Sequence, residues 1–141
     1  MEIKLAKDSQ EILDHLKVRE IVFIDGQQVP RDLEHDGLDR EATLIVAYLN
    51  SSPIGAGRYR LVDNYAKIER IAVLEEYRNL GIGKKIMEFI ENEIRENTNI
   101  ELLKLNSQCS AAPFYERLDY KKKGDTFTEA GIEHILMVKV I

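Results

Sequence analysis

The sequence feature that most restricts the fold is an amphipathic helix placed between two strand-like segments. Apolar residues recur at helical spacing and mark one buried face: Ile82, Ile86, Phe89, Ile90 and Ile94. The alternating segment Tyr65–Leu74 precedes them, and the apolar segment Leu102–Leu105 follows. Because a helix between two strands carries the chain back to its starting end, we expect these two strands to be parallel neighbours in one sheet.

The chain before this crossover predicts a strand, a helix and a three-stranded meander. Glu2–Ala6 alternates like a short strand, and Asp8 or Ser9 can cap a helix that runs to about Phe23. The expected apolar stripe of this helix consists of Ile12, Leu13, Leu16 and Ile21. After a loop with one helical turn near Asp32–Asp36, the predicted antiparallel strands are Thr43–Leu49, Ile54–Val62 and Tyr65–Leu74.

The chain after the crossover predicts one short helix, Ser110–Leu118, and two final strands, Tyr120–Lys123 and Ile132–Val140. The complete order, β-α-β-β-β-α-β-α-β-β, is that of a mixed α/β sheet. The length of 141 residues and a hydrophobic content of 44% fit one domain over residues 1–141, with enough apolar surface for a core.

Composition excludes several classes of function. No apolar run approaches the roughly 18 residues of a membrane span, and Met1–Gln10 does not resemble a signal peptide. The single cysteine, Cys109, fits the reducing cytoplasm, and with three dispersed histidines it makes a metal site unexpected. A net charge of -5 opposes nucleic-acid binding, and Lys121–Lys123 is interpreted as a solvated strand end.

A glycine-containing loop joins the meander to the amphipathic helix. It contains Gly81 and Gly83, with cations at Arg78 and Lys84. Free backbone N–H groups in the first turn and the positive end of the helix dipole favour an anion there. We interpret this segment as a pyrophosphate-binding loop, with a simple turn before a helix as the alternative.

Two common phosphate-binding motifs do not fit this loop. A nucleoside-triphosphate loop requires a glycine where Arg78 stands and Ser or Thr where Lys85 stands. A dinucleotide fingerprint requires a third glycine at the position of Ile86.

The pattern Arg78-x-x-Gly81-x-Gly83, at the start of a helix after a strand, resembles the acetyl-CoA loop of the GCN5-related N-acetyltransferases (GNAT family). Segment Phe114–Tyr120 resembles the Phe-Tyr-x-x-x-Gly-Phe segment of the same family, with Ala111 at the expected distance before it. The resemblance covers roughly Ile3–Val140. It implies an α/β (α+β) fold with a mixed, mostly antiparallel sheet of about six or seven strands, flanked by about four helices.

Two further segments are similar to a small bacterial, ElaA-like branch of the family: Val29-Pro30 with Glu34, Asp36, Asp39 and Ala42, and Gly131–His134. The chain departs from the family pattern at Asp119, where glycine is usual, and at Gln108, where asparagine is common.

The resemblance implies that acetyl-CoA is the acyl donor. Backbone groups of Ile71, Ala72 and Val73 would lie along the pantetheine arm. The other implied contacts with the cofactor are Arg78, Asn79, Leu80, Gly81, Ile82, Gly83, Lys84, Gln108, Ala111 and Phe114.

The implied chemistry is direct attack of a primary amine on the thioester, without a covalent enzyme intermediate, so Cys109 is not expected to be a nucleophile. The N–H of Ile71 would stabilise the oxyanion, and Tyr115 would act as general acid towards the departing sulfur. Glu69 is the leading candidate for general base, because the two-residue repeat of a strand places it on the face of Ile71 and Val73. The acidic loop or water are the alternatives for the base.

The acceptor is expected to be a small-molecule or peptide amine. Glu34, His35 and Asp36 are candidates to bind it, although a surface loop rich in acids is the simpler interpretation. His134 lies on a late strand, where a structural role is favoured over a catalytic one. Two other functions remain open: a catalytically weak acetyl-CoA sensor or interaction module, and a structural protein. The sequence does not indicate the oligomeric state, and a homodimer is the commonest arrangement among soluble oligomers.

Overall fold

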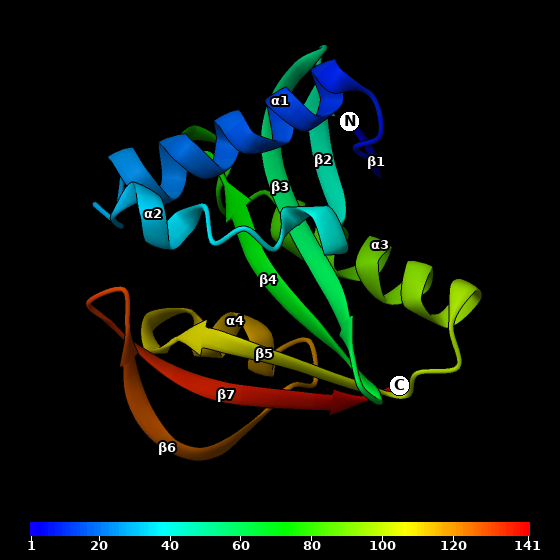
Figure 1. Cartoon of the computed structure of the whole chain (residues 1–141), viewed down its shortest axis with the longest axis vertical. Coiled ribbons are helices and arrows are strands. Elements are labelled where there is room, and N and C mark those ends of the chain that lie inside the picture. The colour runs from blue at the N-terminus through cyan, green and yellow to red at the C-terminus, as the bar shows by residue number, and fades with distance from the viewer.

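A seven-stranded mixed sheet forms the centre of the protein (Figure 1). The computed structural model describes residues 1–141 and gives the strand order β1-β2-β3-β4-β5-β7-β6. The strands are β1 Glu2–Leu5, β2 Thr43–Leu49, β3 Ser52–Val62, β4 Tyr65–Val73, β5 Leu102–Gln108, β6 Lys121–Glu129 and β7 Ile132–Val140. Strands β4 and β5 are parallel and every other neighbouring pair is antiparallel, which confirms the predicted crossover.

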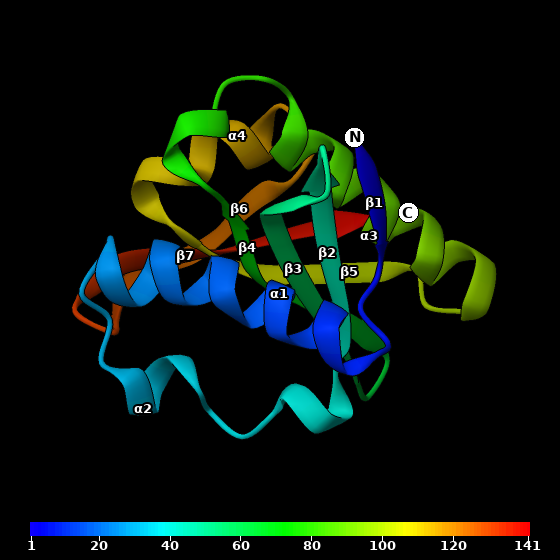
Figure 2. The ribbon, with the colours of Figure 1, turned by 90° about the horizontal axis from the view of Figure 1, so that it is seen from above.

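Four α-helices cover the two faces of this sheet. They are α1 Ser9–Arg19, α2 Arg31–Glu34, α3 Ile82–Asn97 and α4 Ala112–Glu116. Figure 2 shows α1 and α2 on one face, and α3 and α4 on the other. No helix is both long enough and apolar enough to cross a membrane.

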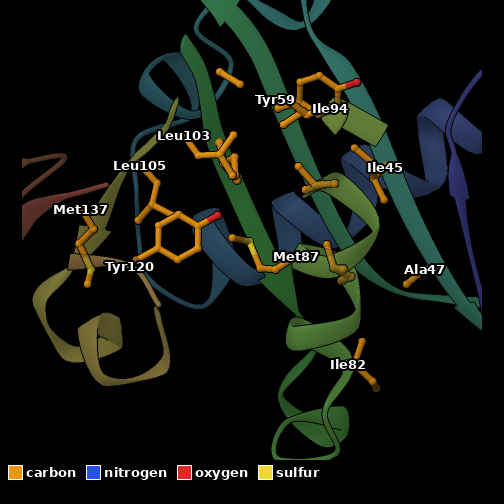
Figure 3. Close-up of a cluster of buried hydrophobic side chains, with 14 of the residues drawn as sticks. Ile45, Ala47, Tyr59, Ile82, Met87, Ile94, Leu103, Leu105, Tyr120 and Met137 are labelled. Carbon is orange, nitrogen blue, oxygen red and sulfur yellow. The ribbon is translucent and has the colours of Figure 1, made fainter. Parts of the chain in front are cut away.

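The main core lies between the sheet and α3 (Figure 3). Four of the five predicted residues of the helix face are buried, and the fifth, Phe89, is half-buried against the same cluster. They pack on strand residues such as Ile45, Leu103 and Met137, which are fully buried. Burying this apolar stripe fixes α3 across the back of β3 and β4.

Helix α1 begins where the sequence predicts, because the Asp8 carboxylate accepts a hydrogen bond of 2.8 Å from the N–H of Glu11. It then continues as a π-helix over Glu20–Asp25. Its predicted apolar stripe is partly wrong, since Leu13 is 60% and Ile21 is 39% exposed. The side chains that this segment buries are His15, Val18, Arg19 and Val22. The buried face is partly polar because Arg19 pairs with Glu34 and Asp39, and Asp39 also pairs with Arg58 of β3.

The last hairpin is longer than the sequence predicts. Strand β6 runs to Glu129 instead of ending at Lys123, and all nine of its residues are exposed. It forms one edge of the sheet, where backbone pairing with β7 holds it. An edge strand that buries neither face has no hydrophobic alternation to reveal its length.

Candidate active site

A cleft opens where β4 and β5 separate. The two strands pair from Tyr65 opposite Leu102 to Ile68 opposite Leu105, and no ladder joins them beyond this point. Their divergence is visible in Figure 1. A cavity of about 560 Å³ occupies the gap. Its walls come from β4, β5, α4, the β6–β7 turn and the segment between α1 and β2.

A β-bulge in β4 lies at the edge of this cleft. Arg58 of β3 pairs with Glu69, but Ala56, two residues away, pairs with Ala72, so β4 contains one extra residue. Arg70 within the bulge has a φ of 57°, in the left-handed region that non-glycine residues rarely adopt. The bulge bends β4 at the point where it leaves β5.

The bulge places Glu69 and Ile71 on opposite faces of the sheet. Glu69 forms an ion pair with Arg58 on the α1 side. Ile71 and Val73 instead pack against the core that α3 covers. The prediction that Glu69 shares a face with Ile71 and Val73 is therefore wrong, because the extra residue interrupts the two-residue repeat of the strand.

Backbone groups after the bulge face the cleft. The N–H of Leu74 donates a hydrogen bond of 2.9 Å to the carbonyl oxygen of Ile54 on β3. Successive N–H groups of a strand alternate in direction, so those of Ile71 and Val73 point away from β3, whereas that of Ala72 points towards it. Ile71 and Val73 both line the cavity, which leaves their N–H groups available to a molecule in the cleft.

The loop after β4 turns sharply before α3. The carbonyl oxygen of Val73 accepts a hydrogen bond of 2.9 Å from Nε of Arg78, so this guanidinium lies at the cavity wall. Asn79 and Gly81 follow with φ values of 65° and 80°. Glycine has no steric penalty in this left-handed conformation, and asparagine tolerates it better than most residues.

The first turn of α3 has free N–H groups. No side chain caps the helix, and the N–H of Lys85 makes the first helical bond, 3.1 Å long, to the carbonyl oxygen of Gly81. The N–H groups of Ile82, Gly83 and Lys84 are therefore without helical partners. Ile82 is buried, whereas Leu80 and Lys84 are exposed. The positive end of a 16-residue helix with free donors is suited to a phosphate group.

Gly83 lies in a tightly packed position. A Cβ atom at this position would lie 3.2 Å from Cζ of Phe114, which is tighter than ordinary van der Waals contact. The Phe114 ring of α4 therefore packs directly on the first turn of α3. Ala111, just before α4, lines the cavity.

Tyr115 of α4 contributes to the cavity wall. Its ring packs edge-on against Phe114 and Tyr120, with centroid distances of 4.9 and 6.0 Å. Burial raises the pKa of the Tyr115 hydroxyl well above its ordinary value. At neutral pH this group is therefore a protonated hydrogen-bond donor.

The two departures from the family pattern are visible in the structure. Asp119 has a φ of 73°, so the turn after α4 keeps the left-handed conformation that glycine usually provides. The side-chain amide of Gln108 donates a hydrogen bond of 2.8 Å to Oε1 of Gln27. Gln108 thus lines the cavity from the α1 side and ties β5 to the segment after α1.

Arg58 is the centre of an ion-pair network on the α1 side of the cleft. Its fully buried guanidinium contacts Asp36 at 2.6 Å, Asp39 at 2.8 Å and Glu69 at 2.7 Å. Arg60 contacts the other oxygen of Glu69 at 2.9 Å. Burial acts to raise the pKa of Asp36 and of Glu69, but hydrogen bonds and charge from the arginines outweigh it and lower both pKa values. An ionised carboxylate between two guanidiniums accepts protons poorly, so this geometry opposes a role for Glu69 as general base.

A second part of the network ties the α2 segment to the bulge. The buried Glu34 carboxylate lies 2.7 Å from Arg19 and 2.8 Å from Arg70. Arg70 also donates to the carbonyl oxygens of Leu33 and Glu34 at 3.2 Å. Glu34 and Asp36 both line the cavity, and arginine side chains already neutralise their negative charges. His35 is exposed and does not line the cavity.

Sequence reasoning missed the arginines of this network and the place of His134 in the cavity wall. Arg58 and Arg60 interrupt a strand that is otherwise apolar and rich in glycine, and this is a usable signal of a buried polar cluster. Arg70 gave no such signal, because a bulge depends on pairing between strands. No group of three or more His, Cys, Asp or Glu side chains is placed to hold a metal ion.

Comparison with protein families gives one match over most of the chain. The family model described as "Acetyltransferase (GNAT) domain" matches residues 10–141. The Bacillus subtilis protein named "Uncharacterized N-acetyltransferase YjcF" is 39% identical over 140 residues, which cover 99% of each chain.

Solved structures share the fold at low sequence identity. Escherichia coli ElaA superposes with a TM-score of 0.84 at 20% identity, over 99% of both chains. An aminoglycoside 6'-N-acetyltransferase complexed with coenzyme A has a TM-score of 0.79 at 13% identity, covering 99% of this chain and 97% of that one. A GNAT family acetyltransferase from Elizabethkingia anophelis with acetyl-CoA bound has a TM-score of 0.75 at 16% identity, with the same coverage.

Proposed function

The chain belongs to the GNAT family of acetyltransferases, and on this premise we propose that residues 1–141 form one domain that transfers the acetyl group of acetyl-CoA to a primary amine. The observation that carries this proposal is the uncapped N-terminus of α3, which follows β4 and Arg78, both of which contribute to the cavity wall. Its free N–H groups fit a diphosphate, and the cavity fits the arm and acyl group that follow it.

Coenzyme A is bound mainly by the backbone. The N–H groups from Asn79 to Lys84 hold the diphosphate, and the left-handed conformation of Gly81 lets the loop turn around it. The groups of Ile71 and Val73 that face the cleft bond the pantetheine arm. Phe114 supports the first turn of α3 from behind.

Two groups act on the reacting thioester. When bound, acetyl-CoA supplies an acetyl group in thioester linkage. The N–H of Ile71 stabilises the negative charge that develops on the carbonyl oxygen as the amine attacks. The Tyr115 hydroxyl, kept protonated by burial, donates a hydrogen bond to the sulfur as the carbon–sulfur bond breaks. The amine attacks directly, so no residue of the chain forms a covalent bond with the acetyl group.

Calorimetry with coenzyme A, followed by a thiol-release assay, tests this function. The assay uses acetyl-CoA with polyamines, amino sugars, aminoglycosides, amino acids and peptides. We expect saturable heat with coenzyme A and thiol release with at least one amine class. Absence of binding would overturn the function. Binding without thiol release for every amine would instead favour an acetyl-CoA sensor with the same fold.

A further inference from the structure

His134 of β7 lies in the wall of the cavity that the acceptor must enter. It pairs with Gln108 of β5, and residues that face each other in an antiparallel ladder project from the same side of the sheet. Gln108 bonds Gln27, two residues after the π-helix Glu20–Asp25 that continues α1, so His134 also projects to the α1 side. The groups expected to hold coenzyme A near Phe114 and Gly83 lie on the α3 side. His134 therefore approaches the cleft from the face opposite the cofactor.

The hydrogen bonds of His134 fix its tautomer. Nδ1 lies 2.7 Å from the carbonyl oxygen of Ile132, and only a protonated nitrogen can donate to a carbonyl. In the neutral ring the lone pair is consequently on Nε2. That atom makes no hydrogen bond, and its nearest charged neighbour is Oε2 of Glu129 at 3.6 Å. The Phe127 ring stacks on the imidazole with a centroid distance of 5.9 Å, which holds its orientation.

The other acidic residues of the cavity are already paired with arginine. Glu34, Asp36 and Glu69 each contact at least two basic side chains. Glu129 is the remaining carboxylate in the lining, and its one ion-pair contact is with His134. A base that accepts a proton from an ammonium needs an unoccupied lone pair, and Nε2 of His134 provides one.

We propose that His134 is the general base of the transfer and that Glu129 stabilises the imidazolium which forms. This inference rests on the proposed function and deepens it. Nε2 takes one proton from the acceptor ammonium, directly or through one water, and the freed lone pair of the nitrogen forms the bond to the acyl carbon. The carbon–sulfur bond then breaks. A second proton leaves the nitrogen as the amide forms and restores, through solvent, the one that Tyr115 gives to sulfur. The proton on His134 passes to solvent beside the exposed Glu129.

The base role predicts a dependence on the basicity of the acceptor. Propylamine is almost entirely protonated at neutral pH, whereas 2,2,2-trifluoroethylamine is mostly neutral and needs no base to free its lone pair. In thiol-release assays at pH 7, His134→Gln should lower kcat/KM for propylamine about 100-fold and for trifluoroethylamine only a few-fold. Equal losses for the two amines, or no loss, would overturn the proposal while leaving the acetyltransferase function standing.

A neighbouring residue gives the matched control. Glu133 precedes His134 on β7, is exposed and points to the other side of the strand, so Glu133→Gln should change neither rate. Calorimetry with coenzyme A should give the same affinity for wild type and His134→Gln. A protein that binds no coenzyme A and releases no thiol would refute the proposed function instead.

Nitrogen NMR of the imidazole tests the base without turnover. We expect the free protein to show the tautomer with hydrogen on Nδ1, and propylammonium to shift the Nε2 resonance saturably, with and without coenzyme A. The His134→Gln spectrum assigns the signal. A hydrogen on Nε2, or a resonance that propylammonium does not move, would overturn the proposal even if neither small amine is acetylated.

Discussion

Arg58 and Glu69 face each other in the β3–β4 ladder, and Nε of the guanidinium donates a hydrogen bond of 2.8 Å to Oε2 of the carboxylate. The arginine side chain is fully buried, and that of Glu69 is 10% exposed. The pair lies directly before the bulge, so it anchors β4 where the strand turns away from β5.

Removal of the Glu69 charge is predicted to be costly for stability. Glu69→Gln removes one of the three carboxylates that contact the buried Arg58 and the closer of the two that contact Arg60, and we expect a loss of roughly 2 kcal/mol in the free energy of unfolding. Glu41→Gln is the matched control, because Glu41 also contacts Arg60 but is 63% exposed, at 3.4 Å. The control should lose less than about 1 kcal/mol. Urea unfolding at pH 7 measures both, and equal losses would contradict a structural role specific to Glu69.

Stability is predicted to fall as the pH drops from about 6.5 to about 4. His15 is fully buried, its Nδ1 lies 2.8 Å from the carbonyl oxygen of Ile45, and its Nε2 lies 3.1 Å from Arg19. Burial lowers the pKa of His15 to about 4. Below the ordinary histidine pKa, the unfolded chain binds a proton at His15 that the folded protein does not bind, so acid favours unfolding. The pKa difference corresponds to roughly 3 kcal/mol in total.

The histidine variants separate this effect from other titrations. In chemical denaturation at several pH values, His15→Gln should flatten the slope above pH 4, and His35→Gln, at an exposed position, should not. The lowered pKa values of Asp36 and Glu69 affect stability in a lower pH range. Their ionised carboxylates stabilise the fold, and this stabilisation is lost only as the pH falls through the ordinary carboxylate pKa and below it. A wild-type slope in His15→Gln would refute the assignment.

Two glycines with the same backbone conformation should differ in their effect on coenzyme A binding. Gly81 and Gly124 have φ values of 80° and 81°, and at neither site does another atom lie within 4 Å of the place that a methyl group would occupy. Alanine at either site should reduce stability by about 1 kcal/mol. Only Gly81→Ala should weaken coenzyme A binding, by tenfold or more in calorimetry, because it alters the loop at the α3 N-terminus. Equal affinities would argue against a diphosphate at this site.

Two neighbouring tyrosines should separate catalysis from stability. Tyr115→Phe should lower kcat roughly 100-fold with unchanged affinity for coenzyme A, because it removes only the donor to the sulfur. The Tyr120 hydroxyl donates a hydrogen bond of 2.7 Å to Glu91 in the core, so Tyr120→Phe should reduce stability by about 1–2 kcal/mol and leave kcat near wild type. Wild-type turnover in Tyr115→Phe would remove the general-acid assignment.

The order of elements was predictable from the sequence because its signals are local. The apolar spacing from Ile82 to Ile94 fixes a helix, the alternation in Tyr65–Leu74 fixes a strand, and their order requires the parallel crossover. The positions of Gly81 and Gly83 follow in the same way, because both lie where α3 begins, whereas Tyr115 stands out only through the resemblance of Phe114–Tyr120 to the family segment.

The tertiary structure alone decided which side chains meet. The extra residue at Arg70 places Glu69 on the face of the sheet opposite Ile71. No local sequence pattern indicates this bulge, because it depends on the pairing of β4 with β3. Segments far apart in the chain also bring Arg58 to Asp36 and His134 to the cavity wall. Local periodicity determines which face of an element is apolar, whereas strand register and long-range ion pairing determine which charges remain free to react.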